Sequence, residues 1–597
     1  MSLAGRSSMA PMASANAPTP ASRPTTPAPW RTQLGKESRL PNLYYGAISP
    51  GSLRRLSTFT ALPPPEQLCM GPWEGVYRYV RQDSGLWATL HGGRLTTSRL
   101  KDALGLRDRT AARLVGGPQA AEEGVSKAYH HLVNNPLYTP AVAAPAAAPG
   151  AVAVAGAALA GEGPPPPPAR DEAEAVARNE EARLRYNAQL RAAVAEAEAA
   201  GRPLPLEPGW DEADRRRISE LAALAVGASG GSRMRLLWGT LQESAAVATV
   251  GLLFPGSQLE EVGLVCLTDT SRWGVDASEL PPLGASPDAL ITHFVPVTHE
   301  DIEAARTALT ASGSRTSSDA AAAAAAQAVA SQLLRTALER HTQQAVAAWA
   351  EASPSGPTTA AQAASAGSSS GGSSGNGSGS SSGQAPPLHC NTTEEAEVWL
   401  VQELLRRPAS LSAATAAATA SPVSSSGSSD GSSTGGGVAA VVRIREVVEV
   451  KNHCPFVYKD QRKARKRGVV INYAAADRGP VSGLWPLWVP QLQAHMAAAG
   501  ASSALLLSRS PSRGVRLFRV YRDDQFLASA WELVRELQAS HVVRRVPPGP
   551  DPWSGRPGYG GLIERVVGLA TGAQVVVETR GTPLLAGADP DAFWKLR

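Results

Sequence analysis

Apolar positions along the chain fall into blocks that predict alternating helices and strands. A run at 439–451 predicts a strand whose Val448 and Val450 pack into the core. Other apolar runs predict strands at 263–267, 283–291, 504–507 and 515–521, and helical spacing follows Ser98 and recurs at 235–250, 488–499 and 526–538. This mixture predicts an α/β fold with a mixed sheet flanked by helices.

Segments of low complexity separate these blocks. Residues 138–168 are rich in Ala and Pro, which predicts a stiff spacer. Residues 170–200 predict one charged helix, solvent-exposed because its apolar face is thin. Residues 301–352 predict an Ala-rich helix, and most of 353–437 is Ser, Gly and Ala, which predicts a flexible, disordered coil around a short helix at 392–407.

The simplest organisation is one core interrupted by two long insertions. Because loop-closure entropy grows slowly with length, segments far apart in the sequence can still supply adjacent strands. The expected divisions are a disordered or transit-peptide-like tail at 1–40, core segments at 41–137, 210–300 and 438–540, insertions at 138–209 and 301–437, and a Pro/Gly-rich tail at 541–597.

Composition limits the class of protein and its compartment. A net charge of +5 and a pI of about 9.0 are compatible with nucleic-acid binding. The four cysteines form no CxxC pair, which argues against a disulfide framework or zinc finger and favours a reducing compartment. The N-terminus lacks acidic residues through Lys36 and resembles an organellar transit peptide, a disordered tail being the alternative. We expect an intracellular protein of the chloroplast, mitochondrion or nucleus, neither secreted nor membrane-spanning.

Glu449 and Lys451 occupy alternate positions of the predicted strand 439–451. Residues i and i+2 of a strand point to the same face, so this carboxylate and this ammonium group lie side by side. A carboxylate can hold a divalent metal ion, and a lysine can steady an attacking water. A lone Glu-x-Lys more often marks the solvated face of a strand, so the interpretation depends on the residues that accompany it.

Further motifs accompany this strand in a fixed order. They are a Trp87, His91 and Thr96-Thr97-Ser98 element, WGTLQE at 238–243, SPDAL at 286–290, EVKNHCPF at 449–456 and QLQAHM at 491–496. Together they resemble the YqaJ viral-recombinase family, the lambda-exonuclease-like branch of the PD-(D/E)XK nucleases. The resemblance implies a restriction-endonuclease-like α+β core and metal-dependent cleavage of DNA.

The same resemblance implies a metal site for Mg²⁺ or Mn²⁺, ions that prefer oxygen ligands. Asp288 and Glu449 would bind the ion together with the carbonyl of Val450. Glu243 would complete the site or hold a second ion. Lys451 would orient the attacking water.

Two more sets of residues acquire roles through the resemblance. Gln491 would contact the nucleophile or the backbone near the metal. Ser98, with His91 or Arg94, would receive a 5′-terminal phosphate. The chain departs from the family pattern at His91, where an arginine is usual, and in Asn452-His453, which lengthen the strand's exit.

Ordinary structural roles remain open for several of these residues. Glu243 could be an acid on the surface of a helix, and Asp288 could form a turn. Ser98 could cap the helix that follows it. Gln491 could be an exposed polar residue of a helix.

The expected activity is that of a metal-dependent DNA exonuclease, 5′ to 3′ on linear duplex DNA, in recombination or repair. A structure-specific endonuclease on the same fold and a catalytically inert DNA-binding or scaffold protein are the alternatives. Family members often act with a single-strand-annealing protein, and some form rings. The expected partners are therefore DNA, such an annealing protein and further copies of the chain.

Overall fold

The computed structural model describes residues 50–116, 124–138, 169–202, 231–311, 319–352, 388–406, 437–458, 473–475, 477–511 and 513–579. Residues 1–40 and most of 138–168 and 353–437 lie outside these ranges, so the predictions of a transit peptide, a stiff spacer and a coil there stay predictions. The fold follows from the elements that lie inside them.

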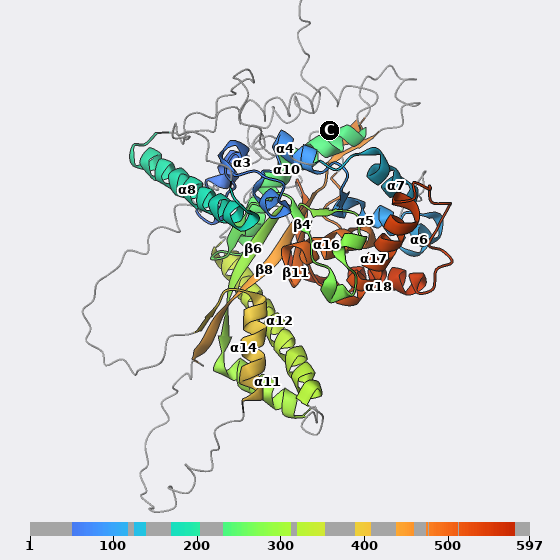
Figure 1. The fold of residues 1–597 in the computed structure, drawn as a ribbon. Helices are drawn as coiled ribbons and strands as arrows, with labels where there is room; N and C mark the ends of the chain where they lie inside the picture. The colour runs from blue at the N-terminus through green and yellow to red at the C-terminus, as the bar shows by residue number, and fades with distance from the viewer. Residues whose placement is uncertain are drawn as a thin grey trace, which may run out of the picture.

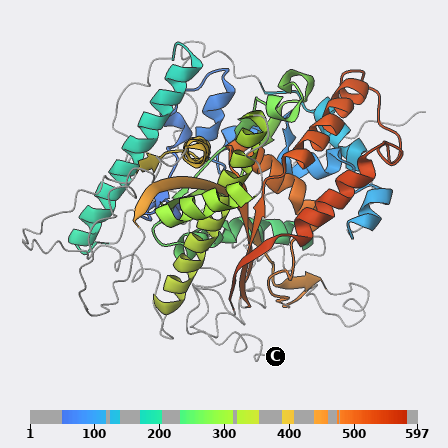
Figure 2. The same ribbon diagram turned by 90° about the horizontal axis from the view of Figure 1, so that it is seen from below.

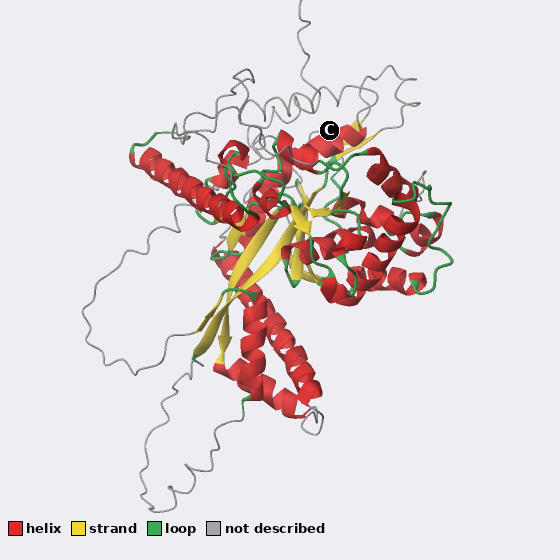
Figure 3. Cartoon of the chain, in the orientation of Figure 1, coloured by secondary structure: helices red, strands yellow, loops and turns green. Residues whose placement is uncertain are grey.

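A mixed sheet forms the centre of the molecule (Figure 3). Its strands are, in spatial order, β1 (Phe59–Thr60), β3 (Gln258–Glu260), β6 (Ala289–Thr298), β8 (Val438–Asn452), β11 (Ser503–Ser510), β12 (Gly514–Tyr521) and β13 (Gln574–Thr579), with β7 (Leu388–Cys390) paired to β8. The pairs β1–β3, β8–β11 and β7–β8 are parallel and the others antiparallel. The prediction of an α/β fold with a mixed sheet flanked by helices is confirmed.

Strand β8 is the longest in the sheet, with 15 residues, and its register places the candidate residues. Ala289 of β6 pairs with Val448 on one side, and Leu506 of β11 pairs with Glu449 on the other. Because Asp288 directly precedes β6, it lies beside the Glu449–Lys451 stretch. The long insertion between them leaves from the far end of β6, as loop-closure entropy allows.

The expected strand at 283–291 is two strands in different sheets. β5 (Leu283–Ala285) pairs with β2 (Leu95–Thr96) and β4 (Val265–Leu267), whereas β6 starts at Ala289 in the central sheet. Pro287 lacks a backbone N–H and cannot continue a ladder, which accounts for the break. The break leaves Ser286-Pro287-Asp288 between the two sheets.

One face of the central sheet is covered by helices drawn mainly from the two ends of the chain (Figure 1). These are α5 (Thr97–Ala103), α7 (Gly124–Asn134), α16 (Val489–Ala499), α17 (Asp524–Leu537) and α18 (Tyr559–Thr571). Their apolar side chains pack against Val447, Leu506 and Phe518 of the sheet. Glu449 and Lys451 share this face with Val447, because they alternate with Val448 and Val450 along β8.

The opposite face packs against α10 (Gly231–Leu253) and α8 (Glu172–Ala199). The expectation that α8 is solvent-exposed is wrong on one face, where Tyr186 and Leu190 are buried. Asn187 exchanges hydrogen bonds of 2.9 Å with the backbone of Ala61. A few large apolar residues and a buried amide were enough to dock a helix whose pattern is otherwise polar.

Part of the second expected insertion is a folded helical lobe. α11 (His299–Ala311), α12 (Asp319–Ala352) and α14 (Thr393–Leu405) group at one end of the sheet (Figure 1), and Figure 2 shows the same lobe from below. Leu334 and Leu400 are buried there against Val295 and Ile444 of the sheet. The short helix expected near 392–407 is confirmed as α14, and β7 is a further ordered element in the segment 353–437 that was expected to be mostly coil.

The expected C-terminal tail is also wrong for its first part. α18 packs against α17, and β13 extends the sheet beyond β12. Trp553, in the Pro/Gly-rich stretch before α18, donates a hydrogen bond of 3.0 Å to the carbonyl of Ala103. The prolines and glycines around it obscure the spacing of apolar residues in the sequence. Apart from several short 3-10 turns, the remaining short elements of the described residues are α3 (Pro50–Arg54), α4 (Gly85–Leu90), α6 (Arg109–Leu114), β9 (Phe456–Tyr458), β10 (Tyr473–Ala475) and a π-helical turn at Gln538–Val542.

One helix among the described residues is long and apolar enough to cross a membrane, namely α10 over Arg235–Leu253. Most of that stretch is buried, with Ala246, Val250 and Leu253 packed against the sheet. Burial inside the protein accounts for its apolar character.

Candidate active site

Glu449 lies at the centre of the candidate site and is only 3% exposed. Its Oε1 accepts a hydrogen bond of 2.5 Å from Lys451 Nζ and one of 2.7 Å from Gln491 Nε2. Gln491 reaches Glu449 because α16 packs on the same face of the sheet through Leu492 and Met496. Three residues expected at the site from the sequence therefore meet at one carboxylate oxygen.

Asp288 joins this group through the backbone of β8. Its Oδ2 accepts a hydrogen bond of 2.6 Å from the Val450 N–H, which continues the ladder beyond the start of β6. Burial raises the pKa of Asp288 well above its ordinary range, and the nearby carboxylates of Glu449 and Glu243 raise it further. The three carboxylates repel one another, so a cation bound among them would be stabilised.

Lys451 supplies the compensating charge within the group and remains partly exposed. Burial lowers the pKa of its ammonium group, but Glu449 and Asp288 outweigh that effect and raise the pKa overall. Lys451 is therefore protonated at neutral pH, able to donate to an oxygen but not to act as a base.

Glu243 projects from α10 into a cleft of about 390 Å³ beside Asp288. Glu261 and Asp83 also line this cleft, and both bind the guanidinium of Arg54, at 2.5 and 3.2 Å. The cation of Arg54 is thus used internally. The carboxylates in the wall of this cleft repel a polyanion such as DNA, and a bound cation would reduce that repulsion.

A divalent ion fits the donor set, although the carboxylates are not gathered around a ready-made centre. Within the described residues, no three His, Cys, Asp or Glu side chains stand close enough together to hold a metal ion. Oε2 of Glu449, however, is buried without a hydrogen-bond partner among the described residues, and Glu243 is close enough to Asp288 to raise the pKa of that carboxyl. A carboxylate oxygen such as Glu449 Oε2, beside two further carboxylates, suits Mg²⁺ or Mn²⁺.

The residues expected to bind a 5′-phosphate are placed less favourably. Arg94 is buried, donates to Glu74 at 2.7 Å and lies over the ring of Tyr77, so its charge is already used. His91 donates from Nδ1 to the carbonyl of Trp87 at 2.7 Å, and its ring lies tilted against the Trp87 indole. Burial lowers the pKa of His91, which leaves it neutral.

Ser98 is the exposed member of the expected phosphate-binding set. It is the second residue of α5, whose N-cap position belongs to Thr96, so the alternative role of Ser98 as an N-cap is wrong. Its hydroxyl lies 3.2 Å from that of Thr96.

Three residues near the site were missed by reasoning from the sequence. His495 is fully buried with Nδ1 3.4 Å from Glu449 Oε2, and Thr97 Oγ1 lies 2.6 Å from His495 Nε2. Burial lowers the pKa of His495 to about 4, so its ring is neutral. Lys101 lies near enough for Lys451 and Glu449 to affect its pKa, which burial lowers. Helical spacing from Gln491 and Ser98 was the signal that could have found His495 and Lys101.

Comparisons of the chain with protein-family models, with curated proteins and with solved structures find no match. Function is therefore inferred from the residues and their geometry.

Proposed function

We propose that the chain is a metal-dependent nuclease that hydrolyses phosphodiester bonds of DNA, on a restriction-endonuclease-like core. The observation that carries the proposal is the meeting of Asp288, Glu449 and Lys451 on neighbouring strands. The order of the motifs in the sequence also supports it. So does the proximity of Asp288 to the Glu449-x-Lys451 pair, which a long insertion separates in the sequence. Buried groups with perturbed pKa values beside a cleft are the physical mark of a functional site.

Asp288, Glu449 and the Val450 carbonyl would hold Mg²⁺ or Mn²⁺, with Glu243 completing the set. When bound, such an ion polarises the scissile phosphate and lowers the pKa of a water. Because the pKa of Asp288 is raised, a cation and a proton compete for this carboxyl, and binding of the cation favours its ionised form.

The chain's own residues have separable tasks in this proposal. Lys451, protonated and partly exposed, offsets the negative charge that develops on the phosphate. Gln491 holds Glu449 from α16 and fixes the direction of its carboxylate. Lys101, on the same side as Lys451, offers a second cation to the backbone of the substrate.

We further propose that cleavage proceeds from a 5′ end of linear duplex DNA, as the resemblance implies, in recombination or repair. Ser98 is the exposed group that supports this polarity, and Arg94 does not, because Glu74 holds it. An annealing protein and further copies of the chain remain the proposed protein partners.

The test is a time course on end-labelled linear duplex DNA, with covalently closed circles as the control, in Mg²⁺ and in EDTA. The proposal expects nucleotides with 5′-phosphates from the linear DNA in Mg²⁺ only. Rapid cutting of the circles would favour the endonuclease alternative. Binding of DNA without cleavage of either substrate would favour the inert scaffold.

A further inference from the structure

Two buried polar atoms without partners face each other at the centre of the candidate site. Glu449 Oε2 and His495 Nδ1 are 3.4 Å apart, and neither has a hydrogen-bond partner in the part of the chain that the structure describes. The other Glu449 oxygen is already held by Lys451 and Gln491. Lys451 and Gln491 therefore account for Oε1 of Glu449, and the role of the contact between Oε2 and His495 is still to be explained.

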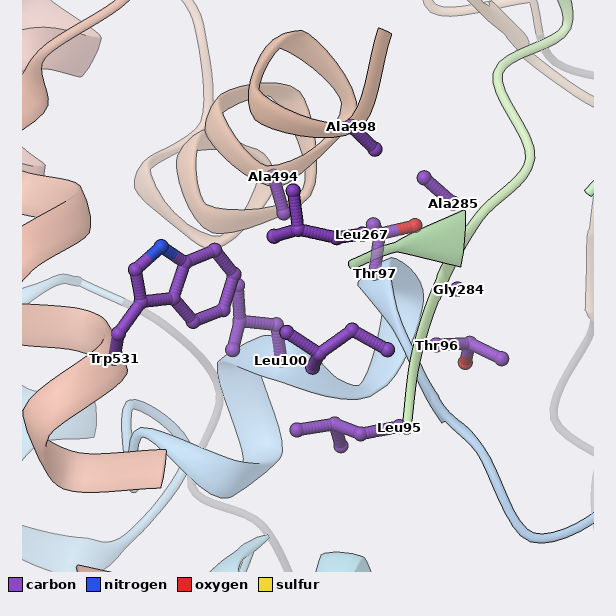
Figure 4. Close-up of a pocket in the computed structure, with 11 residues that line it drawn as sticks. Leu95, Thr96, Thr97, Leu100, Leu267, Gly284, Ala285, Ala494, Ala498 and Trp531 are labelled. Carbon is purple, nitrogen blue, oxygen red and sulfur yellow. The ribbon is translucent and has the colours of Figure 1, made fainter. Parts of the chain in front are cut away.

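Helix packing fixes the ring of His495 in this place. α5 and α16 are in contact, and Ala494 and Ala498 of α16 lie opposite Thr97 and Leu100 of α5 around a small apolar cavity (Figure 4). The cavity holds about 10 Å³, room for no more than one water, and its wall is almost entirely apolar. The cavity is a small gap where α5 packs against α16, and it is not a ligand site. The packing of these two helices brings Thr97 close to His495.

The carboxylate of Glu449 decides which ring nitrogen of His495 carries the proton, because it can only accept, whereas the Thr97 hydroxyl can donate or accept. A neutral imidazole has one N–H and one acceptor nitrogen. If the proton were on Nε2, the Nδ1 lone pair would face the lone pairs of the Glu449 carboxylate, and both buried acceptors would be left unsatisfied, which costs free energy. With the proton on Nδ1, Thr97 donates to Nε2 at 2.6 Å and Nδ1 faces Glu449 as a donor. In this tautomer a donor faces an acceptor at both ring nitrogens, and no two lone pairs oppose each other between Thr97 and Glu449.

We infer that His495 is a positioning residue that orients Glu449 from its second side and ties it to the first residue of α5. This inference rests on the proposed function, because it concerns how a metal-binding carboxylate is held. A separation of 3.4 Å is long for a hydrogen bond, and such contacts at active sites shorten when the substrate or ion is present. Ser98, the candidate phosphate ligand, is the next residue after Thr97, so the same chain of contacts links the two parts of the site.

Paired substitutions separate the two nitrogens of the ring. The amide nitrogen of asparagine takes the place of Nδ1, and that of glutamine takes the place of Nε2. His495→Asn therefore keeps a donor toward Glu449, whereas His495→Gln loses it and keeps the contact with Thr97. The dissociation constant for Mn²⁺, measured by calorimetry without DNA, reports on the carboxylate directly.

We expect His495→Gln to weaken Mn²⁺ binding by about 10–100-fold, as for other residues that orient metal ligands, and His495→Asn to stay within about threefold of the wild type. Thr97→Val frees the tautomer and shifts Mn²⁺ binding in the same direction, and Thr97→Ser restores it. Adding Thr97→Val to His495→Gln brings no further loss, because both act through one contact. Mn²⁺ affinity measured on the folded fraction keeps a loss of fold from imitating these effects.

The matched control is His293→Gln, a change at an equally buried histidine on the opposite face of the sheet. It should lower stability in urea and leave the Mn²⁺ affinity of the folded protein unchanged. Equal Mn²⁺ affinity in His495→Gln, His495→Asn and wild type would overturn the inference while the nuclease proposal stood. A wild-type protein that neither binds Mn²⁺ nor cuts DNA would overturn both.

Discussion

Strand β8 carries two buried glutamates, Glu446 and Glu449, three residues apart and on opposite faces of the sheet. Their sequence settings look alike, since both interrupt the same apolar run. Their surroundings differ in one respect, which is whether the negative charge of the carboxylate is fully compensated.

Glu446 is compensated completely. Arg519 donates to its two oxygens at 2.8 and 2.7 Å, and His293 Nε2 lies 3.0 Å from Oε2. Arg519 also donates to Thr342 of α12 at 3.2 Å, which ties the helical lobe to the sheet. This closed arrangement leaves Glu446 no oxygen for a ligand, so its role is to hold the fold together.

Glu449 has the opposite balance. Lys451 faces three carboxylates, those of Glu449, Asp288 and Glu243, and Lys101 is the other ammonium group near Glu449. One Glu449 oxygen has no hydrogen-bond partner among the described residues. Burial alone therefore does not distinguish the two acids, and the incomplete compensation of Glu449 is what makes it the candidate for a functional role.

Removing the cation at Glu446 should have the largest effect on stability. Arg519→Ala leaves a buried carboxylate unpaired, and we expect a loss of about 3–5 kcal/mol in the free energy of unfolding, measured in urea. Cleavage by the folded fraction should be unchanged. The double variant with Glu446→Leu and Arg519→Met removes the charge as well and should recover much of the loss. If Arg519→Ala lost less stability than an Arg→Ala change at an exposed position, Arg519 would not be compensating a buried charge.

Removing the cation at Glu449 should instead cost activity. Lys451→Ala is expected to reduce cleavage of linear duplex DNA by about 10²–10³-fold, the size seen when a group that stabilises transition-state charge is lost. Retention of DNA binding, measured by fluorescence anisotropy, is expected because one cation is a small part of a phosphate-binding surface. If the variant cuts DNA at the wild-type rate, Lys451 has no catalytic role.

Asp288 at the candidate site and Glu446 in the closed network should also respond oppositely to pH. Asp288 has a folded-state pKa raised by burial and by its neighbours, so below that pKa it is protonated and must release a proton to bind a metal ion. Mn²⁺ affinity should therefore rise with pH from above the ordinary value of 3.8 and level off only beyond the raised pKa. Calorimetry in buffers of different ionisation heat would detect the released proton, and a pH-independent affinity would contradict this.

Burial would raise the pKa of Glu446, but Arg519 and His293 outweigh it, and the pKa lies well below its ordinary value of 4.5. A depressed folded-state pKa contributes stability that is present above pH 4.5 and lost as the pH falls below it. Unfolding by urea between pH 7 and 3 should show a steeper loss in the wild type than in Glu446→Gln. Parallel pH profiles in the two proteins would disprove this assignment.

The smallest expected effect concerns Lys101. Lys101→Ala should weaken DNA binding modestly and reduce the slope of log affinity against log salt by about 0.9, as expected for one lost phosphate contact. Its effect on cleavage at saturating DNA should be small. Arg99→Ala, on the same helix, is the comparison that tests whether the contact is specific to Lys101.

The sequence was sufficient to predict much of the sheet and part of the site. β8, β11 and β12 follow from apolar runs, and the Glu449-x-Lys451 alternation placed both side chains on one face. Asp288 was also assigned to the site, although Pro287 splits the strand that was expected to carry it. These predictions depend on local patterns that a strand cannot satisfy in more than one way.

Features that depend on distant partners could not be predicted. Arg94 looked like a phosphate ligand, and only the fold shows that Glu74 takes its charge. α14 and β13 lie next to low-complexity or Pro/Gly-rich sequence, and their few buried residues, such as Leu400 and Val577, gain meaning from the surfaces they cover. His495 lies at a buried position of α16 among apolar neighbours, and its contact with Glu449 depends on how α16 packs on the sheet, which the helical pattern does not reveal.

The most direct test of the central claim uses the two glutamates as a pair. Glu449→Gln and Glu446→Gln change the same atoms three residues apart on one strand. Mn²⁺ binding by calorimetry and cleavage of linear duplex DNA in Mg²⁺ are measured on the folded fraction of each. The account predicts that Glu449→Gln loses both while Glu446→Gln keeps both with reduced stability. Retention of Mn²⁺ binding and cleavage by Glu449→Gln would contradict it.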